Sequence, residues 1–162
     1  MNKYSTKKKD LKPLIKSRKI INDYIEQYPN NEYSLDLKFK LSLIENQLAA
    51  KEIYIAKYYI KIQKWIPAIN RLKNIVNNYQ QTIFIEEALH RLVEIYYTLG
   101  LVQEAEKTAK ILGYNYNSSK WYETSYALLN KDYKKEQRLL REKSKKKEQG
   151  LVRKTINKIL NK

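Results

Sequence analysis

Apolar residues recur along most of the chain at intervals of three and four, which places them on one face of an α-helix. The first such segment begins at Pro13, a residue favoured at a helix start because it has no N–H to leave unpaired. It ends near Tyr28, because Pro29 disfavours the helical conformation in the residue before it. A second segment begins near Glu32 and meets no helix breaker until Gln63, about thirty residues later.

The long second segment carries two apolar stripes. One consists of Leu37, Leu41, Ile44 and Leu48, and the other of Leu35, Phe39, Ile53, Tyr59 and Ile60. A helix that is apolar on more than one side is packed between neighbours. We therefore expect both stripes to be covered by other helices.

Four shorter helices follow. We expect one to begin at Ile66–Pro67, and the others to span about Ile85–Leu99, Val102–Leu112 and Trp121–Leu129. Gly100 is expected to adopt the left-handed conformation that commonly follows a helix, and Gly113 is expected to end the next helix.

The helical pattern contains an internal repeat. Four positions correspond at an interval of 37 residues, because Tyr59, Trp65, Ala68 and Tyr79 are matched by Tyr96, Val102, Ala105 and Tyr116, three of them identical. An aromatic residue, a polar turn and a second aromatic residue also recur, over 28–33, 79–84 and 116–121. Hairpins of about 34 residues with small residues at the helix crossing are typical of tetratricopeptide repeats. The predicted fold is therefore all-α, with two or three such hairpins stacked into a short superhelix. The longer first interval predicts one long helix shared by two repeats.

Basic residues are concentrated at the two ends of the chain. The formal net charge is +16, but residues 13–130 carry 15 bases and 12 acids and are nearly neutral. Residues 131–162 carry thirteen bases and four acids, interleaved with apolar residues at roughly helical spacing. We predict a basic disordered N-terminus over 1–12, a repeat domain over 13–130 and a basic, helical or disordered extension over 131–162.

Composition excludes several kinds of chemistry. The chain has no cysteine, one histidine (His90) and only three glycines, which argues against disulfides, thiol catalysis, histidine-rich metal sites and glycine-loop nucleotide folds. We expect no cofactor and no enzymatic activity, with His90 a hydrogen-bonding helix residue and the adjacent Glu86 and Glu87 stabilising a helix start. No apolar run is long enough to span a membrane, and the opening MNKYSTKKKD contains no secretory signal or lipidation motif.

One string of residues resembles the YfiO (BamD) family, the tetratricopeptide lipoproteins of the outer-membrane β-barrel assembly machine. The resemblance covers about residues 14–130, and its closing part, 115–129, is similar to the alphaproteobacterial branch. It rests on Tyr28-Pro29, Leu48-Ala49, Glu52, Tyr58-Tyr59, Ala68-Ile69-Asn70-Arg71, Tyr79-Gln80-Gln81-Thr82, Glu87 to Glu94, Leu99-Gly100, Glu104-Ala105, Leu112-Gly113, Asn115-Tyr116, Ser119, Trp121-Tyr122 and Tyr126-Ala127-Leu128-Leu129.

The resemblance implies a scaffold made of the C-terminal half of such a protein, at the periplasmic face of the outer membrane. In the family this half docks on a POTRA domain of the barrel-forming, BamA-like subunit and on small accessory lipoproteins. Arg71 occupies the position of the family's partner-contacting arginine. The family's lipidated cysteine and first repeats have no counterpart among these 162 residues.

The residues themselves suggest how such a contact would be made. Arg71 lies between the inward-facing Ile69 and Leu72, so it is expected to point outward, free to pair with a carboxylate. Possible neighbours on the same face are Lys64, Asn70, Lys73 and Asn74. Trp65 is either a partner anchor or a packing residue at the start of a repeat.

The basic extension supports rival hypotheses. A cluster of bases there could bind phosphates of anionic lipids or, less expected, of nucleic acid: Arg138, Arg141, Lys143, Lys145, Lys146 and Lys147. The ordinary alternative is a solvated charged segment. Two further functions therefore stay open, a cytoplasmic helical-repeat protein that binds RNA or anionic surfaces through its ends, and a tetratricopeptide adaptor of another envelope complex.

Overall fold

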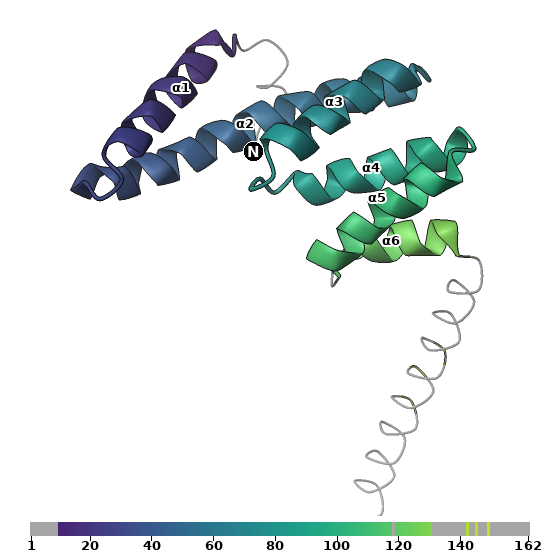
Figure 1. Cartoon of the computed structure of the whole chain (residues 1–162). Helices are drawn as coiled ribbons and strands as arrows, with labels where there is room; N and C mark the ends of the chain where they lie inside the picture. The colour runs from purple at the N-terminus through teal and green to yellow at the C-terminus, as the bar shows by residue number, and fades with distance from the viewer. Residues whose placement is uncertain (1–9, 118, 131–141, 143–144, 146–148, 150–162) are drawn as a thin grey trace, which may run out of the picture.

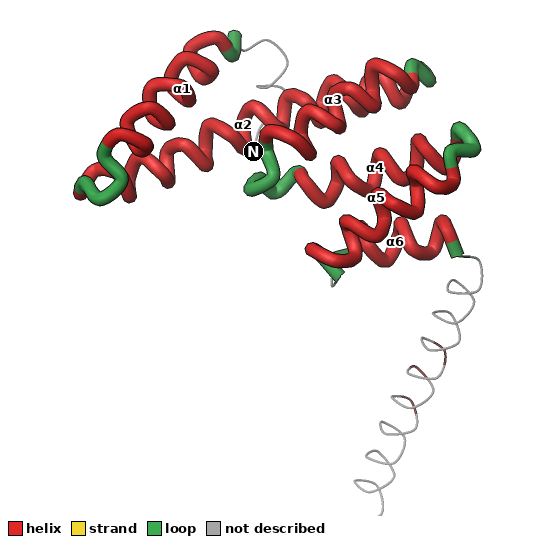
Figure 2. The backbone as a smooth tube through the Cα atoms, in the orientation of Figure 1, coloured by secondary structure: helices red, strands yellow, loops and turns green. Residues whose placement is uncertain are grey.

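The computed structural model describes residues 10–117 and 119–130, together with residues 142, 145 and 149. Within residues 10–130 so described, every regular element is an α-helix (Figure 2). The six helices are α1 (Lys12–Gln27), α2 (Glu32–Lys61), α3 (Trp65–Asn78), α4 (Ile85–Thr98), α5 (Val102–Asn115) and α6 (Lys120–Leu129).

The helices form antiparallel hairpins that stack side by side (Figure 1). The long α2 packs against α1 along its first half and against α3 along its second half. The α4–α5 hairpin stacks on α3 through α4, and α6 closes the stack against α4 and α5. This is a tetratricopeptide-like helical stack, which confirms the predicted fold class and the prediction of one long helix shared by two repeats.

The hairpin turns reproduce each other in detail. The N–H of Lys64 donates to the carbonyl of Tyr59 at 2.9 Å, and the N–H of Leu101 donates to the carbonyl of Tyr96 at 2.9 Å. These residues are 37 positions apart, as the repeat predicts. The sequence repeat is therefore also a repeat of backbone structure.

The residue at the centre of each turn has a positive φ. Gly100 has a φ of 74°, which confirms the left-handed conformation predicted for it. The equivalent position in the first hairpin is Gln63, with a φ of 57°. A side chain is strained in this region, so the shared geometry is imposed by the hairpin and not by the residue.

The turns between hairpins are also alike. Tyr28, Tyr79 and Tyr116 each donate a backbone N–H to the carbonyl four residues earlier, at 2.8, 2.9 and 2.8 Å. Each also accepts, through its own carbonyl, a bond from the residue three positions later. The tyrosine that opens each predicted aromatic turn thus ends one helix and starts the bend toward the next.

The core runs through the middle of the stack. Small residues with no exposed surface lie where the helices cross, among them Ala68, Ala88 and Ala105. Larger side chains fill the spaces between them, including Leu72 and Ile75 of α3. Close packing of this kind allows few volume changes, so these positions fix the spacing of the hairpins.

Gly113 does not end a helix, contrary to the sequence prediction. It lies inside α5, which continues to Asn115. A Cβ at this position would come within 2.6 Å of Cε2 of Tyr122 on α6. The glycine therefore serves a close approach between two helices, which a helix-stop interpretation does not anticipate.

The second apolar stripe of α2 is covered only in its later half. Ile53 and Ile60 pack into the core, as expected, but Leu35 and Phe39 are 78% and 63% exposed. The expectation that both stripes would be covered is therefore wrong for the first half of α2. The reason is that α1 lies along the opposite stripe there and α3 reaches only the second half of α2.

Candidate functional site

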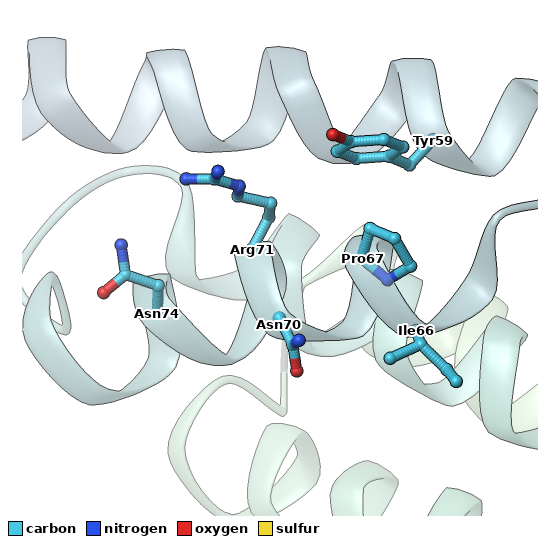
Figure 3. A pocket seen from close by; sticks show the side chains of 6 residues that line it. All are labelled: Tyr59, Ile66, Pro67, Asn70, Arg71 and Asn74. Atoms are coloured by element: carbon cyan, nitrogen blue, oxygen red, sulfur yellow. The ribbon is translucent and has the colours of Figure 1, made fainter.

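An open pocket lies on the surface between α2 and α3 (Figure 3). Its volume is about 370 Å³. One wall comes from α2 and the rest from the first three turns of α3, and the lining residues are Tyr59, Ile66, Pro67, Asn70, Arg71 and Asn74.

Local sequence explains why α3 presents these side chains. Pro67 lies in the first turn of α3, where its missing N–H leaves no intrahelical bond unmade. The buried Ala68 follows and lets α3 approach α2 closely. Arg71 and Asn74 lie one and two turns further on, at the spacing that keeps side chains on one helical face.

Arg71 reaches from α3 across to α2. Its Nη1 lies 3.4 Å and 3.3 Å from the two carboxylate oxygens of Glu52. The side chain of Arg71 is 45% exposed and that of Glu52 only 16%. Arg71 is thus accessible, but it is not free of a partner as the sequence suggested, because an internal carboxylate already faces it.

The remaining polar groups of the pocket offer both hydrogen-bond donors and acceptors. The Oδ1 of Asn74 accepts a bond from Nδ2 of Asn78 at 2.7 Å, and no bond from the amide nitrogen of Asn74 is found among the residues that the structure describes. The hydroxyl of Tyr59 lies at the end of its ring nearer Arg71 (Figure 3). Ile66 is 73% exposed and gives the pocket an apolar edge. A positive fork beside an apolar edge suits an acidic side chain of a protein partner.

A second polar cluster joins α4 to α6. Nδ1 of His90 lies 2.8 Å from Oγ of Ser125, and Nε2 lies 3.4 Å from a carboxylate oxygen of Glu94. His90 is 2% exposed and Ser125 has no exposed surface. The serine–histidine–carboxylate order resembles a hydrolytic triad, but a fully buried hydroxyl offers a substrate no surface. The cluster ties two helices together, and the prediction that His90 is a hydrogen-bonding helix residue is confirmed.

Ion pairs extend this cluster to the surface. The hydrogen bond from His90 holds the pKa of the Glu94 carboxyl at about 2, with a further contribution from Arg91 at 2.7 Å. Arg91 also lies 3.5 Å from Glu87, which pairs with Lys57 of α2 at 2.6 Å. Glu87 therefore connects α2 with α4, a role beyond the helix-start effect predicted for it.

Comparison with known proteins decides the family. The sequence model described as "YfiO: Outer membrane lipoprotein" matches residues 1–111. The chain belongs to the YfiO family. It is 43% identical over 113 residues to the outer membrane protein assembly factor BamD of Rickettsia prowazekii, and 37% identical over 142 residues to that of Caulobacter vibrioides. The BamD of Neisseria meningitidis serogroup A is 32% identical over 97 residues.

The matches also define how much of the family this chain represents. They cover 70% of the chain for the Rickettsia protein, 88% for the Caulobacter protein and 60% for the Neisseria protein. The chain spans 45% of each of the first two relatives and 36% of the third. The resemblance to the alphaproteobacterial branch of the YfiO family is confirmed by the higher identity of the Rickettsia and Caulobacter proteins.

The structure brings together only part of the set predicted around the family arginine. Asn70, Arg71 and Asn74 line one pocket. Lys64 precedes the first residue of α3 and Lys73 is exposed, but neither lines the pocket. The two lysines therefore remain surface charges outside it.

Trp65 lies at the first position of α3 and is partly buried against the core. Of the two interpretations left open by the sequence, this placement favours a packing residue. Whether its exposed part also touches a partner remains a separate prediction.

Three pocket residues (Tyr59, Ile66 and Pro67), and the Glu52 that faces Arg71, were not predicted as site residues from the sequence. Ile66 and Pro67 lie within a turn and a half of Arg71, so helical spacing was a usable signal for them. Tyr59 and Glu52 come from α2, and their approach to Arg71 depends on how α2 and α3 are aligned. The sequence contains no local signal for that alignment.

The basic extension of this YfiO family member contributes little to the described structure. Lys145 is exposed. Arg138, Arg141, Lys143, Lys146 and Lys147 lie outside the described residues. Over the residues that are described, no helix is both long and apolar enough to cross a membrane. The same residues contain no group of three or more acidic or histidine side chains placed to hold a metal ion.

Proposed function

We propose that this chain is a non-catalytic scaffold in outer-membrane protein assembly, at the periplasmic face of the outer membrane. It would dock on a POTRA domain of the BamA-like barrel subunit, and its stacked hairpins would hold that domain in an orientation suited to β-barrel insertion. Accessory lipoproteins are the second class of partner. The relatives named as outer membrane protein assembly factors support the proposal.

The observation that carries the proposal is the position of Arg71. Its guanidinium lies at an open pocket on a rigid helical hairpin, with an apolar edge beside it. An arginine in this setting offers a carboxylate two parallel hydrogen bonds, which gives orientation as well as attraction. Such a contact needs no cofactor.

Titration calorimetry against the soluble POTRA domains of the same organism's barrel subunit tests the proposal. We expect Arg71→Glu to weaken binding by at least about tenfold, because it replaces attraction by like-charge repulsion. Lys73→Glu is the matched control, since it reverses a charge on the same helix outside the pocket, and it should change the affinity less than about twofold. Equal effects of the two substitutions would place the docking surface elsewhere.

The basic extension favours one additional binding role. Residues 131–162 carry thirteen bases against four acids, and each base near an anionic surface contributes about 1 kcal/mol. We propose that this segment binds an anionic membrane surface beside the docked partner. Sedimentation with phosphatidylglycerol vesicles should deplete the full chain from solution, whereas a chain ending at residue 130 should stay in solution. Preferential binding of duplex RNA over vesicles would favour the RNA-binding alternative instead.

A further inference from the structure

The ion pair that faces the α2–α3 pocket is incomplete. Both carboxylate oxygens of Glu52 approach the same nitrogen of Arg71, Nη1, at 3.4 and 3.3 Å. Within the described part of the chain, Nε and Nη2 of Arg71 make no hydrogen bond, although the guanidinium lies at the open pocket. Fork-like pairs that use two nitrogens are shorter, typically about 2.7–2.9 Å, and stronger.

A second ion pair on the same face of α2 shows the contrast. Glu45 lies two turns before Glu52 and pairs with Arg18 of α1. There, Nε and Nη2 of Arg18 both approach Oε1 of Glu45 at 3.1 Å. Arg18 also donates to the carbonyl of Asn78 at 3.3 Å, so its guanidinium is occupied on several sides. Among the described residues, Arg18 thus engages two of its three nitrogens, Nε and Nη2, whereas Arg71 engages only Nη1 and keeps two for a partner.

We infer that Glu52 is an internal competitor that occupies Arg71 in the unbound chain and sets the affinity of the pocket for an acidic side chain of a protein partner. This inference rests on the docking role proposed for the pocket. Glu52 holds the guanidinium between α2 and α3 and leaves its other two nitrogens for the incoming carboxylate. It also opposes that carboxylate, because two negative charges then share one arginine.

Charge and geometry together support this role. Glu52 is largely covered by protein, so its repulsion of a carboxylate a few ångströms away is weakly screened. The partner offers a better hydrogen-bond geometry than the single-nitrogen contact it supplements. The contact with the partner therefore forms and dissociates readily, since Arg71 has a carboxylate near it both in the unbound chain and in the complex.

Glu52→Gln separates the competing effect from the positioning effect. The amide oxygen of glutamine still accepts a bond from Nη1, but the negative charge is gone. We expect the affinity of the full chain for the soluble POTRA domains to rise about threefold to tenfold, with a steeper loss at high salt. Glu45→Gln is the matched control and should stay within about twofold of the unsubstituted chain.

Arg71→Gln makes the calorimetric result unambiguous. In that background, Glu52→Gln should change the affinity by less than about twofold, because without the guanidinium no partner carboxylate is held beside Glu52. If Arg71→Gln alone leaves POTRA binding unchanged, the proposed docking role fails. If Arg71→Gln weakens binding but Glu52→Gln does not strengthen it, the docking role stands and the competitor role is overturned.

Acetate provides a probe that does not depend on the partner. The Nε–H resonance of Arg71 can be followed by NMR while acetate is added to the full chain. We expect half-maximal shift at about threefold less acetate in Glu52→Gln than in the unsubstituted chain or in Glu45→Gln. An unchanged midpoint in Glu52→Gln would overturn the inference whatever the POTRA measurements show.

Discussion

Helices α1 and α4 have similar lengths, 16 and 14 residues, but very different surroundings. Helix α1 has no buried residue, whereas α4 has eight, including the polar His90. Both carry an apolar face, so the difference comes from neighbours: α1 packs along α2, while α4 contacts α3, α5 and α6. A hairpin repeat gains most of its stability from the hairpins stacked on each side of it.

The comparison predicts an uneven distribution of stability along the chain. Helix α4 should exchange its amide hydrogens only when the whole stack unfolds, and α1 should exchange by local opening. Helices α2 and α3, which line the pocket, lie between α1 and α4 in the stack (Figure 1), so we expect their exchange to be intermediate. Four pairs of substitutions test this gradient, from the largest expected effect to the smallest.

The largest difference is expected for equal truncations in the two helices. Leu89 of α4 is buried, so Leu89→Ala should lower the free energy of unfolding by about 2–5 kcal/mol. Leu14 of α1 is only partly buried, so Leu14→Ala should cost roughly 1 kcal/mol. Urea unfolding followed by circular dichroism measures both. Similar losses in the two variants would contradict the gradient.

The next effect concerns the polar contact between α4 and α6. Ser125→Ala removes the hydroxyl that lies 2.8 Å from Nδ1 of His90 and leaves a buried ring nitrogen without a partner. We expect a loss of about 1–3 kcal/mol in unfolding free energy. Ser42→Ala is the control, because that hydroxyl bonds the carbonyl of Phe39 on an exposed face, and its effect should stay within about 0.5 kcal/mol. If Ser125→Ala left the free energy of unfolding unchanged, the contact between Ser125 and His90 would not stabilise the helical stack.

A smaller and local effect is expected at the edge. Arg18 holds α1 to Glu45, to the carbonyl of Asn78 and, at 5.2 Å, to the ring of Tyr79. Arg18→Gln should cost about 1 kcal/mol. Hydrogen exchange should become faster in α1 and stay unchanged in α4. Lys19→Gln, at the exposed neighbouring position, should change neither the free energy of unfolding nor the exchange rates. If Arg18→Gln accelerated hydrogen exchange more in α4 than in α1, the interpretation would be wrong.

The smallest effect is a pH dependence. Hydrogen bonding by His90 lowers the pKa of the Glu94 carboxyl from 4.5 to about 2. The ionised Glu94 therefore contributes its full stabilisation above pH 4.5, and this stabilisation is lost as the pH falls toward 2. The side chain is 40% exposed, and water reduces the energy involved. Glu94→Gln should flatten the fall in melting temperature over this interval. Glu26→Gln, on the edge helix, is the comparison, and an equal flattening there would assign the effect to general surface charge.

The sequence predicted the helices far better than their mutual placement. Helix α1 ends before Pro29, α2 begins at Glu32 and α4 ends before Gly100, as predicted, because each of these signals acts within a few residues. Gly113 was misread because its reason, the ring of Tyr122, lies on a different helix. The exposure of Leu35 was missed because apolar spacing marks a face without saying whether a neighbour covers it.

The same limit applies to the candidate site. Asn70, Arg71 and Asn74 share a helical face, so spacing within α3 sufficed to group them. The opposing carboxylate of Glu52 required the alignment of α2 with α3, which depends on how Ala68 packs against α2. The most informative feature of the site, an arginine with one partner already present, was therefore visible only in the structure.

The continuous α2 has a mechanical consequence. Its thirty residues form a rod of about 45 Å, with the exposed Leu35 and Phe39 near one end and the pocket residue Tyr59 near the other. A flexible linker with the same number of residues would let two bound partners translate and rotate independently of each other. The rod instead limits both the spacing and the relative angle of anything held at its two ends, so a tilt imposed at one end is transmitted along the helix to the other.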